Sequence, residues 1–149
     1  MKIRLVALDM DGTLLNDRQE VSPRNAAAIR RALDAGVIVC LATGRGVQHV
    51  LPYTEQLGLT TPMITVNGGE IWRRPRELHR RVTMDAEDVL RLRGLALEHG
   101  VWYWAYATDG VYNRERWFEP QEAVRDKTWL KFGYHEENLR ILEQIRDTA

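Results

Sequence analysis

The sequence has little cysteine, no net charge and no long apolar run. One cysteine among 149 residues cannot build an internal disulfide framework. Twenty-one basic residues balance 21 acidic ones, which excludes the global basic field typical of proteins that hold nucleic acid or anionic membranes. The first apolar stretch ends at Asp9 and is too short for a signal-peptide core or a membrane span. We therefore expect a cytoplasmic protein that binds neither nucleic acid nor a membrane.

The first half of the chain alternates strand and helix patterns. Short apolar runs predict three strands, over residues 3–8, 37–42 and 63–66. Two helical patterns lie between them, over residues 23–35 and 47–57. Ser22 and Gly36 mark the ends of the first helix, and Pro52 predicts a distortion within the second. Cys40 lies in an apolar run and is interpreted as a buried hydrophobe. Strands separated by helices predict an α/β fold with a parallel sheet.

The second half has a different pattern. Antiparallel strands are predicted around Pro75, a helix begins after Asp85, and Asp109-Gly110 predicts a hairpin turn. The expected segments are strands 70–74 and 78–82, a helix closing near residue 99, an aromatic strand 101–107 and a helix 136–147. This order is typical of an α+β module. We place the boundary between the two modules at residues 68/69, which gives segments 1–68 and 69–149.

Two aspartates follow the first predicted strand directly, in the segment Asp9-Met10-Asp11-Gly12-Thr13-Leu14. Ligands of open α/β sheets bind beyond the carboxyl ends of the strands, where these side chains are expected. Two such carboxylates can converge on one phosphorus atom or one metal ion, and Gly12 lets the backbone approach an anion. One carboxylate can attack a phosphoryl group while the other transfers protons. The alternative is a turn with two capping aspartates, which the place and rarity of the motif disfavour.

This segment resembles the first motif of the haloacid dehalogenase superfamily, Asp-x-Asp-Gly-Thr-Leu. The run Leu41-Ala42-Thr43-Gly44-Arg45, which closes the second predicted strand, is similar to the second motif. Asn67-Gly68 after the third strand, followed at once by an α+β insertion, resembles the Cof-type branch, whose cap domain enters there. The resemblance implies a Rossmann-like core, represented here by three parallel strands, followed by a partial cap.

The resemblance also implies residue roles. Asp9 would be the nucleophile that forms an aspartyl phosphate, and Asp11 the general acid/base. Both would ligate Mg²⁺, Asp9 through its carboxylate and Asp11 through its backbone carbonyl, which are oxygen donors that suit this ion. The residues implied around the phosphate are Gly12, Thr13, Thr43, Gly44, Arg45 and Asn67. Thr43 is equally suited to cap a helix, Arg45 either points at substrate or lies on the surface, and Asn67 is either a site residue or a turn residue.

Two further motifs of the superfamily are not recognisable in the chain. One is a lysine that neutralises charge on the phosphoryl group, and the other is a Gly-Asp acidic loop that completes the metal site. The later lysines, Lys127 and Lys131, lie in the cap-like half. We therefore expect an N-terminal part of such a protein, with weakened Mg²⁺ binding and weaker stabilisation of the phosphoryl charge.

Three functions remain open from the sequence. The first is a Mg²⁺-dependent phosphatase acting on a small phosphorylated metabolite. The second is a non-catalytic remnant that binds a phosphorylated ligand or a partner chain. The third is a phosphomutase, which shares the covalent half-reaction. A receiver domain is disfavoured because it needs an acceptor aspartate at the end of the third strand, where Asn67 stands.

Other features carry weaker expectations. The strand 3–8 would lie at a sheet edge with apolar faces, which predicts self-association through that edge. The arginines between Arg73 and Arg81 form either a solvated hairpin face or an anion-binding patch. Trp102 and Trp104 are expected either to pack the cap core or to form a wall that faces substrate or a partner. The scattered histidines lack the spacing of metal ligands.

Overall fold

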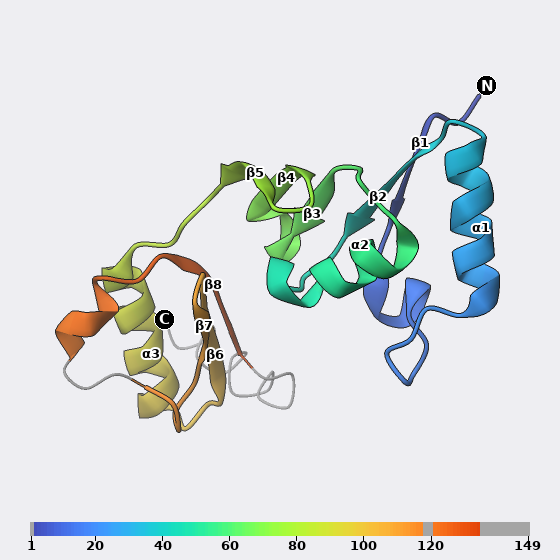
Figure 1. Ribbon diagram of the computed structural model, residues 1–149. Helices are drawn as coiled ribbons and strands as arrows, with labels where there is room; N and C mark the ends of the chain where they lie inside the picture. The colour runs from blue at the N-terminus through green and yellow to red at the C-terminus, as the bar shows by residue number, and fades with distance from the viewer. Residues whose placement is uncertain (1, 118–120, 135–149) are drawn as a thin grey trace. The chain divides into compact units, whose positions relative to one another are not determined.

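A computed structural model describes residues 2–117 and 121–134 of the chain (Figure 1). The chain divides into two compact units, Met1–Val82 and Thr83–Ala149. Within the part of the chain that the structure describes, no helix is long and apolar enough to cross a membrane.

The first unit is built on a five-stranded sheet with the order β1-β2-β3-β4-β5 (Figure 1). Its strands are β1 (Leu5–Leu8), β2 (Ile38–Ala42), β3 (Met63–Thr65), β4 (Glu70–Arg74) and β5 (Glu77–Arg81). The pairs β1–β2 and β2–β3 are parallel, whereas β3–β4 and β4–β5 are antiparallel. The predicted three-stranded parallel core is therefore confirmed, and β1 forms an edge of the sheet.

The hairpin β4–β5 belongs to this sheet. Ile64 of β3 pairs with Ile71 of β4, which in turn pairs with Arg80 of β5. The division between the units therefore falls at Val82/Thr83 and does not coincide with the expected boundary at 68/69. The change from parallel to antiparallel strand patterns after Gly69 predicts a separate module there, but β4 and β5 pair with β3 and extend the core sheet.

Two helices accompany the sheet, α1 (Pro23–Asp34) and α2 (Leu51–Leu57). Ser22 caps α1, because its hydroxyl accepts a hydrogen bond of 3.1 Å from the backbone N–H of Asn25. A separate 3-10 turn, Val47–His49, precedes α2. Pro52 therefore lies in the first turn of α2 and not within a longer helix, which corrects the expected distortion. Proline fits there because first-turn N–H groups have no partner within the helix.

A short helical turn follows β1, and no sequence pattern predicted it. The chain turns through a short helical segment, Met10–Leu14, with non-helical dihedral angles at Asp11 and Gly12. A bridge between Leu15 and Val21 then closes a loop over residues 16–20. Met10, Leu14 and Leu15 are buried in the core of the first unit. These apolar anchors fix the polar residues between and beside them at the end of β1.

The second unit is α+β, as predicted. It holds α3 (Ala86–Glu98) and an antiparallel sheet of order β7-β6-β8, with β6 (Tyr103–Ala107), β7 (Gly110–Tyr112) and β8 (Trp129–Tyr134). Asp85 caps α3 by accepting from the N–H of Glu87 at 2.8 Å. Tyr103 is fully buried and belongs to the core of the second unit. Its neighbour Trp102 is 43% exposed. The predicted helix 136–147 lies outside the described residues.

Candidate functional site

The carboxyl ends of the three parallel strands place Asp9, Thr43 and Asn67 together. Parallel strands end at the same edge of a sheet, so the residues that follow β1, β2 and β3 converge there. They surround a cavity of about 270 Å³ lined by Asp9, Ala42, Thr43, Gly44, Ile64, Asn67 and Gly68. The cavity is open to solvent and is large enough for a small polar group.

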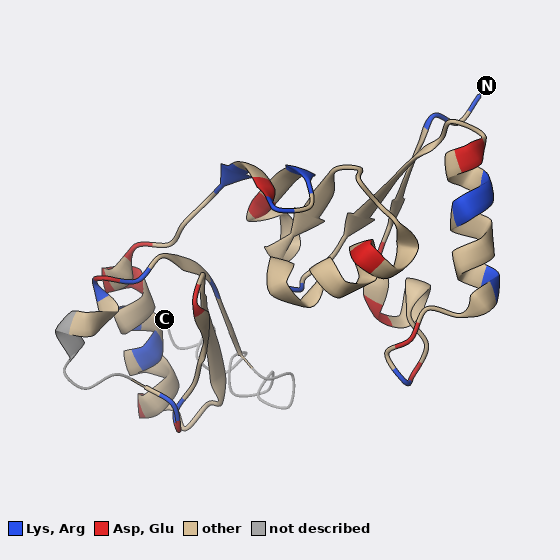
Figure 2. Ribbon diagram, viewed as in Figure 1, with Lys and Arg blue, Asp and Glu red and all other residues tan. Residues whose placement is uncertain are grey.

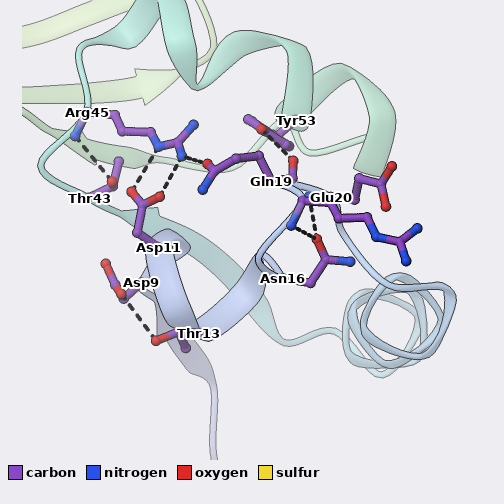
Figure 3. Close-up of polar contacts among 10 residues, drawn as sticks. Asp9, Asp11, Thr13, Asn16, Gln19, Glu20, Thr43, Arg45 and Tyr53 are labelled. Carbon is purple, nitrogen blue, oxygen red and sulfur yellow. Dashed lines mark hydrogen bonds and ion pairs between the residues drawn. The ribbon is translucent and has the colours of Figure 1, made fainter.

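Asp9 lies at the entrance to the turn Met10–Leu14 (Figure 3). Its carboxylate accepts a hydrogen bond of 3.2 Å from the hydroxyl of Thr13. Gly12 adopts a left-handed φ of 70°, a conformation that L side chains rarely adopt. The turn thus exposes Asp9, Gly12 and Thr13 side by side at the end of β1.

Asp11 is held by Arg45. The guanidinium donates from Nε to Asp11 Oδ2 at 2.9 Å and from Nη2 to Oδ1 at 2.5 Å, a two-point ion pair (Figure 3). The hydrogen bond from Arg45 is the main cause that lowers the pKa of the Asp11 carboxyl, and the same bond raises the pKa of Arg45. The side chain of Asp11 nevertheless remains 53% exposed. Arg45 was expected either to point at substrate or to lie on the surface; the structure shows instead an ion pair with Asp11.

Thr43 and Gly44 lie where β2 turns toward Arg45. Thr43 is buried, and its hydroxyl accepts a hydrogen bond of 3.2 Å from the backbone N–H of Arg45. Its carbonyl accepts from the backbone N–H of Asn67 at 3.1 Å, which ties the ends of β2 and β3 together. Gly44 approaches Asn67 so closely that a Cβ there would lie 2.6 Å from Asn67 Oδ1. Asn67 is thus both a left-handed turn residue and part of the cavity wall.

Two residues of the site were missed by sequence reasoning, Gln19 and Tyr53. The Gln19 amide oxygen accepts a hydrogen bond from Arg45 Nη2, and the Tyr53 hydroxyl donates to the Gln19 carbonyl at 2.8 Å (Figure 3). Gln19 is 34 residues from Tyr53 in the chain, so no local pattern connects them. The one sequence signal is the place of Gln19 in a short polar loop directly after the two aspartates.

Basic and acidic positions lie close together along the β4–β5 hairpin (Figure 2), and three of its arginines form ion pairs. Arg74 contacts Glu77, Arg76 contacts Glu55, and Arg81 contacts the buried Glu70. This pairing favours a solvated hairpin face over an anion-binding patch. His79 is exposed and accepts a hydrogen bond from Arg73.

The remaining chemical candidates are two lysines of the second unit, metal-binding clusters and the single cysteine. Lys127 forms an ion pair with Asp109, and Lys131 Nζ lies 4.4 Å from the centre of the Tyr106 ring. Within residues 2–117 and 121–134, no group of three or more His, Cys, Asp or Glu side chains could hold a metal ion. Cys40 is buried, as predicted, and burial raises the pKa of its thiol.

Comparison with known proteins identifies the family to which the chain belongs. A model of haloacid dehalogenase-like hydrolases matches residues 6–147. The chain is 37% identical over 148 residues to the 5-amino-6-(5-phospho-D-ribitylamino)uracil phosphatase YcsE of Bacillus subtilis (strain 168), covering 97% of this chain and 58% of YcsE. It is 31% identical over 143 residues to the HMP-PP phosphatase of Serratia proteamaculans (strain 568), covering 93% of this chain and 50% of that protein.

A solved structure shows the same fold. A phosphatase of the haloalkanoate (HAD) enzyme superfamily from Bacteroides thetaiotaomicron matches with a TM-score of 0.77 and 22% identity, covering 96% of this chain and 60% of that chain. The chain therefore spans about half to three fifths of the length of these proteins. Because the family match runs through nearly the whole sequence and the fold agrees with it, the chain belongs to the haloacid dehalogenase-like hydrolase family.

Proposed function

We propose that the protein is a phosphomonoester hydrolase that works through an aspartyl phosphate on Asp9. The observation that carries this proposal is the convergence of Asp9, Thr43 and Asn67 around one cavity, with Asp11 on the turn that begins after Asp9. Asp9 would act as the nucleophile beside this cavity, and Asp11, two residues along the chain, would transfer protons.

The proposed reaction has two half-reactions. A carboxylate oxygen of Asp9 attacks phosphorus and forms a P–O bond, while the bond from phosphorus to the leaving oxygen breaks. Asp11, released from its ion pair with Arg45 and protonated, gives that oxygen its proton. Water then attacks the aspartyl phosphate, Asp11 takes its proton, and the Asp9 carboxylate is released with inorganic phosphate. The Thr43 hydroxyl and the backbone N–H groups of Gly12, Thr13 and Gly44 would bind the phosphoryl oxygens.

Mg²⁺ fits the donors that the site offers. The Asp9 carboxylate and the Asp11 carbonyl are hard oxygen ligands of the kind that this ion prefers, and Mg²⁺ usually keeps several waters when few protein ligands bind it. Bound there, the ion would neutralise negative charge on the phosphoryl group. The family resemblance implies the carbonyl of Asp11 as the donor, and the carboxylate of Asp11 is paired with Arg45.

The proposed substrate is a small phosphorylated metabolite. YcsE acts on a phosphoribitylamino-uracil, and the Serratia relative on HMP-PP, so related proteins take phosphate esters of small organic molecules. A cytoplasmic location agrees with such substrates. A phosphomutase would use the same Asp9 chemistry with a sugar hydroxyl in place of water.

A second candidate, a phosphate-binding protein without catalysis, is favoured by one observation. Across the described residues no third acidic or histidine side chain joins Asp9 and Asp11 in a metal-holding cluster. Such a protein would bind a phosphorylated ligand at the same cavity without turnover.

The experiment that separates these functions measures both binding and phosphate release. The protein is incubated with phosphomonoesters and Mg²⁺, beside the Asp9→Asn variant. We expect phosphate release by the wild type and its loss in the variant. Binding without release by the wild type would support the non-catalytic candidate, and release that survives Asp9→Asn would overturn the nucleophile assignment.

A further inference from the structure

We propose that a buried polar row across β3, β4 and β5 positions Asn67 for binding the phosphoryl group. The row consists of Thr65, Glu70 and Arg81, and it lies beside the turn that carries Asn67. This inference rests on the proposed function in that phosphate binds in the cavity that Asn67 lines. The three residues are positioning residues, because they lie at the base of the turn and do not line the cavity.

The turn after β3 has an unfavourable backbone. It spans Val66–Gly68, and φ is positive at all three residues, 54° at Val66, 53° at Asn67 and 92° at Gly68. Glycine tolerates such angles, whereas a β-branched residue such as valine rarely adopts them. A segment of this kind persists only where the surrounding structure holds it. The conformation that brings Asn67 to the cavity wall therefore needs anchors on both sides of the turn.

The first anchor is a side-chain hydrogen bond that joins the two ends of the turn. Thr65, the last residue of β3, pairs with Glu70, the first residue of β4. The Thr65 hydroxyl donates to Glu70 Oε2 at 3.0 Å. Thr65 is fully buried and Glu70 is 1% exposed, so the bond lies in a medium of low dielectric constant, which strengthens it. It closes the base of the turn.

Two further contacts fix the orientation of this pair. Arg81, on the neighbouring strand β5, donates from Nε to Glu70 Oε1 at 2.8 Å, and its Nη2 lies 2.8 Å from the same oxygen (Figure 1). The indole N–H of Trp72, two residues further along β4, donates to the Thr65 hydroxyl oxygen at 3.1 Å. Each carboxylate oxygen of Glu70 thus has its own partner, and the Thr65 hydroxyl both donates and accepts. A buried network satisfied in this way is rigid, so the base of the turn has one preferred geometry.

The other side of the turn meets the phosphate cavity. The backbone N–H of Asn67 donates to the Thr43 carbonyl at 3.1 Å, and that of Val66 donates to the Arg45 carbonyl at 2.9 Å. The Asn67 side chain lies against Gly44, and its amide carries two N–H donors of the kind that bind phosphoryl oxygens. If the base of the turn loosens, the unfavourable backbone relaxes and Asn67 leaves the cavity wall. Phosphate binding is then weakened.

The test measures the dissociation constant of inorganic phosphate by titration calorimetry in the presence of Mg²⁺. Thr65→Val removes the hydroxyl with little change of size, and we expect phosphate binding about tenfold weaker, the value of one hydrogen bond. Thr65→Ser keeps the hydroxyl and should bind within about twofold of the wild type. Thr54→Val is the matched control, because Thr54 is a buried threonine of α2 whose hydroxyl donates to the Leu51 carbonyl at 2.7 Å. It loses a comparable hydrogen bond away from the turn and should leave phosphate affinity unchanged.

The outcomes separate positioning from a general loss of stability. Unchanged phosphate affinity in Thr65→Val, or an equal loss in Thr54→Val, would overturn the positioning role. If Thr65→Val does not fold, Arg81→Lys decides, because lysine keeps a cation beside Glu70 but offers one nitrogen in place of two. We expect phosphate affinity about threefold weaker in Arg81→Lys, and unchanged affinity there would overturn the proposal.

A second measurement needs no ligand. Hydrogen exchange of the Asn67 backbone N–H, which the bond to Thr43 protects, reports local opening of the turn. Relative to the amides of β2, this exchange should be about tenfold faster in Thr65→Val and unchanged in Thr54→Val. An unchanged ratio in Thr65→Val would contradict the proposal. A wild type that binds no phosphate would count against the proposed function, and the exchange of the Asn67 N–H would still decide whether Thr65 holds the turn.

Discussion

At the scale of single residues, Arg45 controls the acidity of Asp11. The hydrogen bonds from the guanidinium stabilise the carboxylate, so they lower the pKa of Asp11 from its ordinary value. Arg45→Gln should raise this pKa toward the ordinary aspartate value, because a neutral amide replaces the cation. A pH titration of the Asp11 carboxyl carbon by nuclear magnetic resonance checks this, with Asp34, an exposed aspartate of α1, as internal control.

The same pair makes stability depend on pH in a defined direction. A carboxyl whose pKa is lower in the folded state stabilises the fold above its unfolded pKa, and this stabilisation is lost as the pH falls through the folded pKa. The stability difference between the wild type and Arg45→Gln should therefore shrink toward acid pH. A difference in unfolding free energy that grows toward acid pH would contradict the assignment.

Adding one methyl group at Gly44 tests whether the cavity binds phosphate. A Cβ there would lie 2.6 Å from Asn67 Oδ1, so Gly44→Ala must displace the Asn67 side chain. We expect affinity for inorganic phosphate to fall by up to about tenfold, the value of one hydrogen bond. Titration calorimetry measures this effect. Unchanged affinity would remove Asn67 and the Gly44 backbone from the proposed binding site.

The residues near the first motif were predictable, whereas the contacts between segments distant in sequence were not. Asp9, Asp11, Gly12 and Thr13 are neighbours in sequence, so their meeting at the end of a strand follows from a local pattern. The Gln19–Tyr53 contact depends on how the loop after β1 and α2 meet in space. Sequence reasoning therefore found the proposed reacting groups but left the role of Arg45 open.

At the scale of elements, α3 carries a glycine without a structural need for it. Gly94 lies within the helix, and a Cβ at this position would meet nothing within 4 Å. Gly94→Ala should raise the free energy of unfolding by about 1 kcal/mol, because alanine loses less backbone entropy in a helix. Chemical denaturation measures the change. A destabilised variant would mean that the exposed face of α3 packs differently.

The β4–β5 hairpin depends on a buried acid. Glu70 is 1% exposed, and Arg81 donates to it at 2.8 Å while the Thr65 hydroxyl donates at 3.0 Å. Arg81→Met leaves this carboxylate without its cation, so we expect a loss of about 3 kcal/mol of stability at neutral pH. Arg80→Met, an exposed neighbour on the same strand, should change stability by less than about 0.5 kcal/mol. Denaturant unfolding measures the stability of the two variants. Equal losses of stability would contradict the prediction.

At this scale, helix starts were predicted correctly where the local sequence signal was strong. Ser22 and Asp85 cap α1 and α3 as predicted, because a side-chain oxygen before a helical pattern satisfies free N–H groups. The boundary between the units was expected at 68/69 and lies at Val82/Thr83. Strand patterns alone do not reveal which sheet a hairpin joins. The segment Met10–Leu14 was missed because its shape depends on buried Met10 and Leu14 and not on a periodic pattern.

At the scale of the molecule, the edge strand β1 carries exposed apolar surface. Leu5 is 54% exposed and Ile38 on the adjacent strand 44% exposed. A hollow of about 250 Å³ between β1 and α1, lined in part by Val6, Leu8 and Ile29, adds apolar surface beside this edge. We predict self-association through β1, which light scattering after size exclusion should detect and Leu5→Lys should abolish. A wild type that stays monomeric at high concentration would contradict this prediction.

The central claim is that Asp9 attacks phosphorus, and the most direct measurement is capture of the phosphorylated protein. The wild type and the Asp9→Asn variant are mixed with a phosphomonoester and Mg²⁺, quenched in acid and analysed by mass spectrometry. We predict that one phosphoryl group is added to the wild type, located on the peptide that contains Asp9, and that Asp9→Asn carries none. A phosphoryl group on another residue, or hydrolysis that continues in Asp9→Asn, would contradict the account.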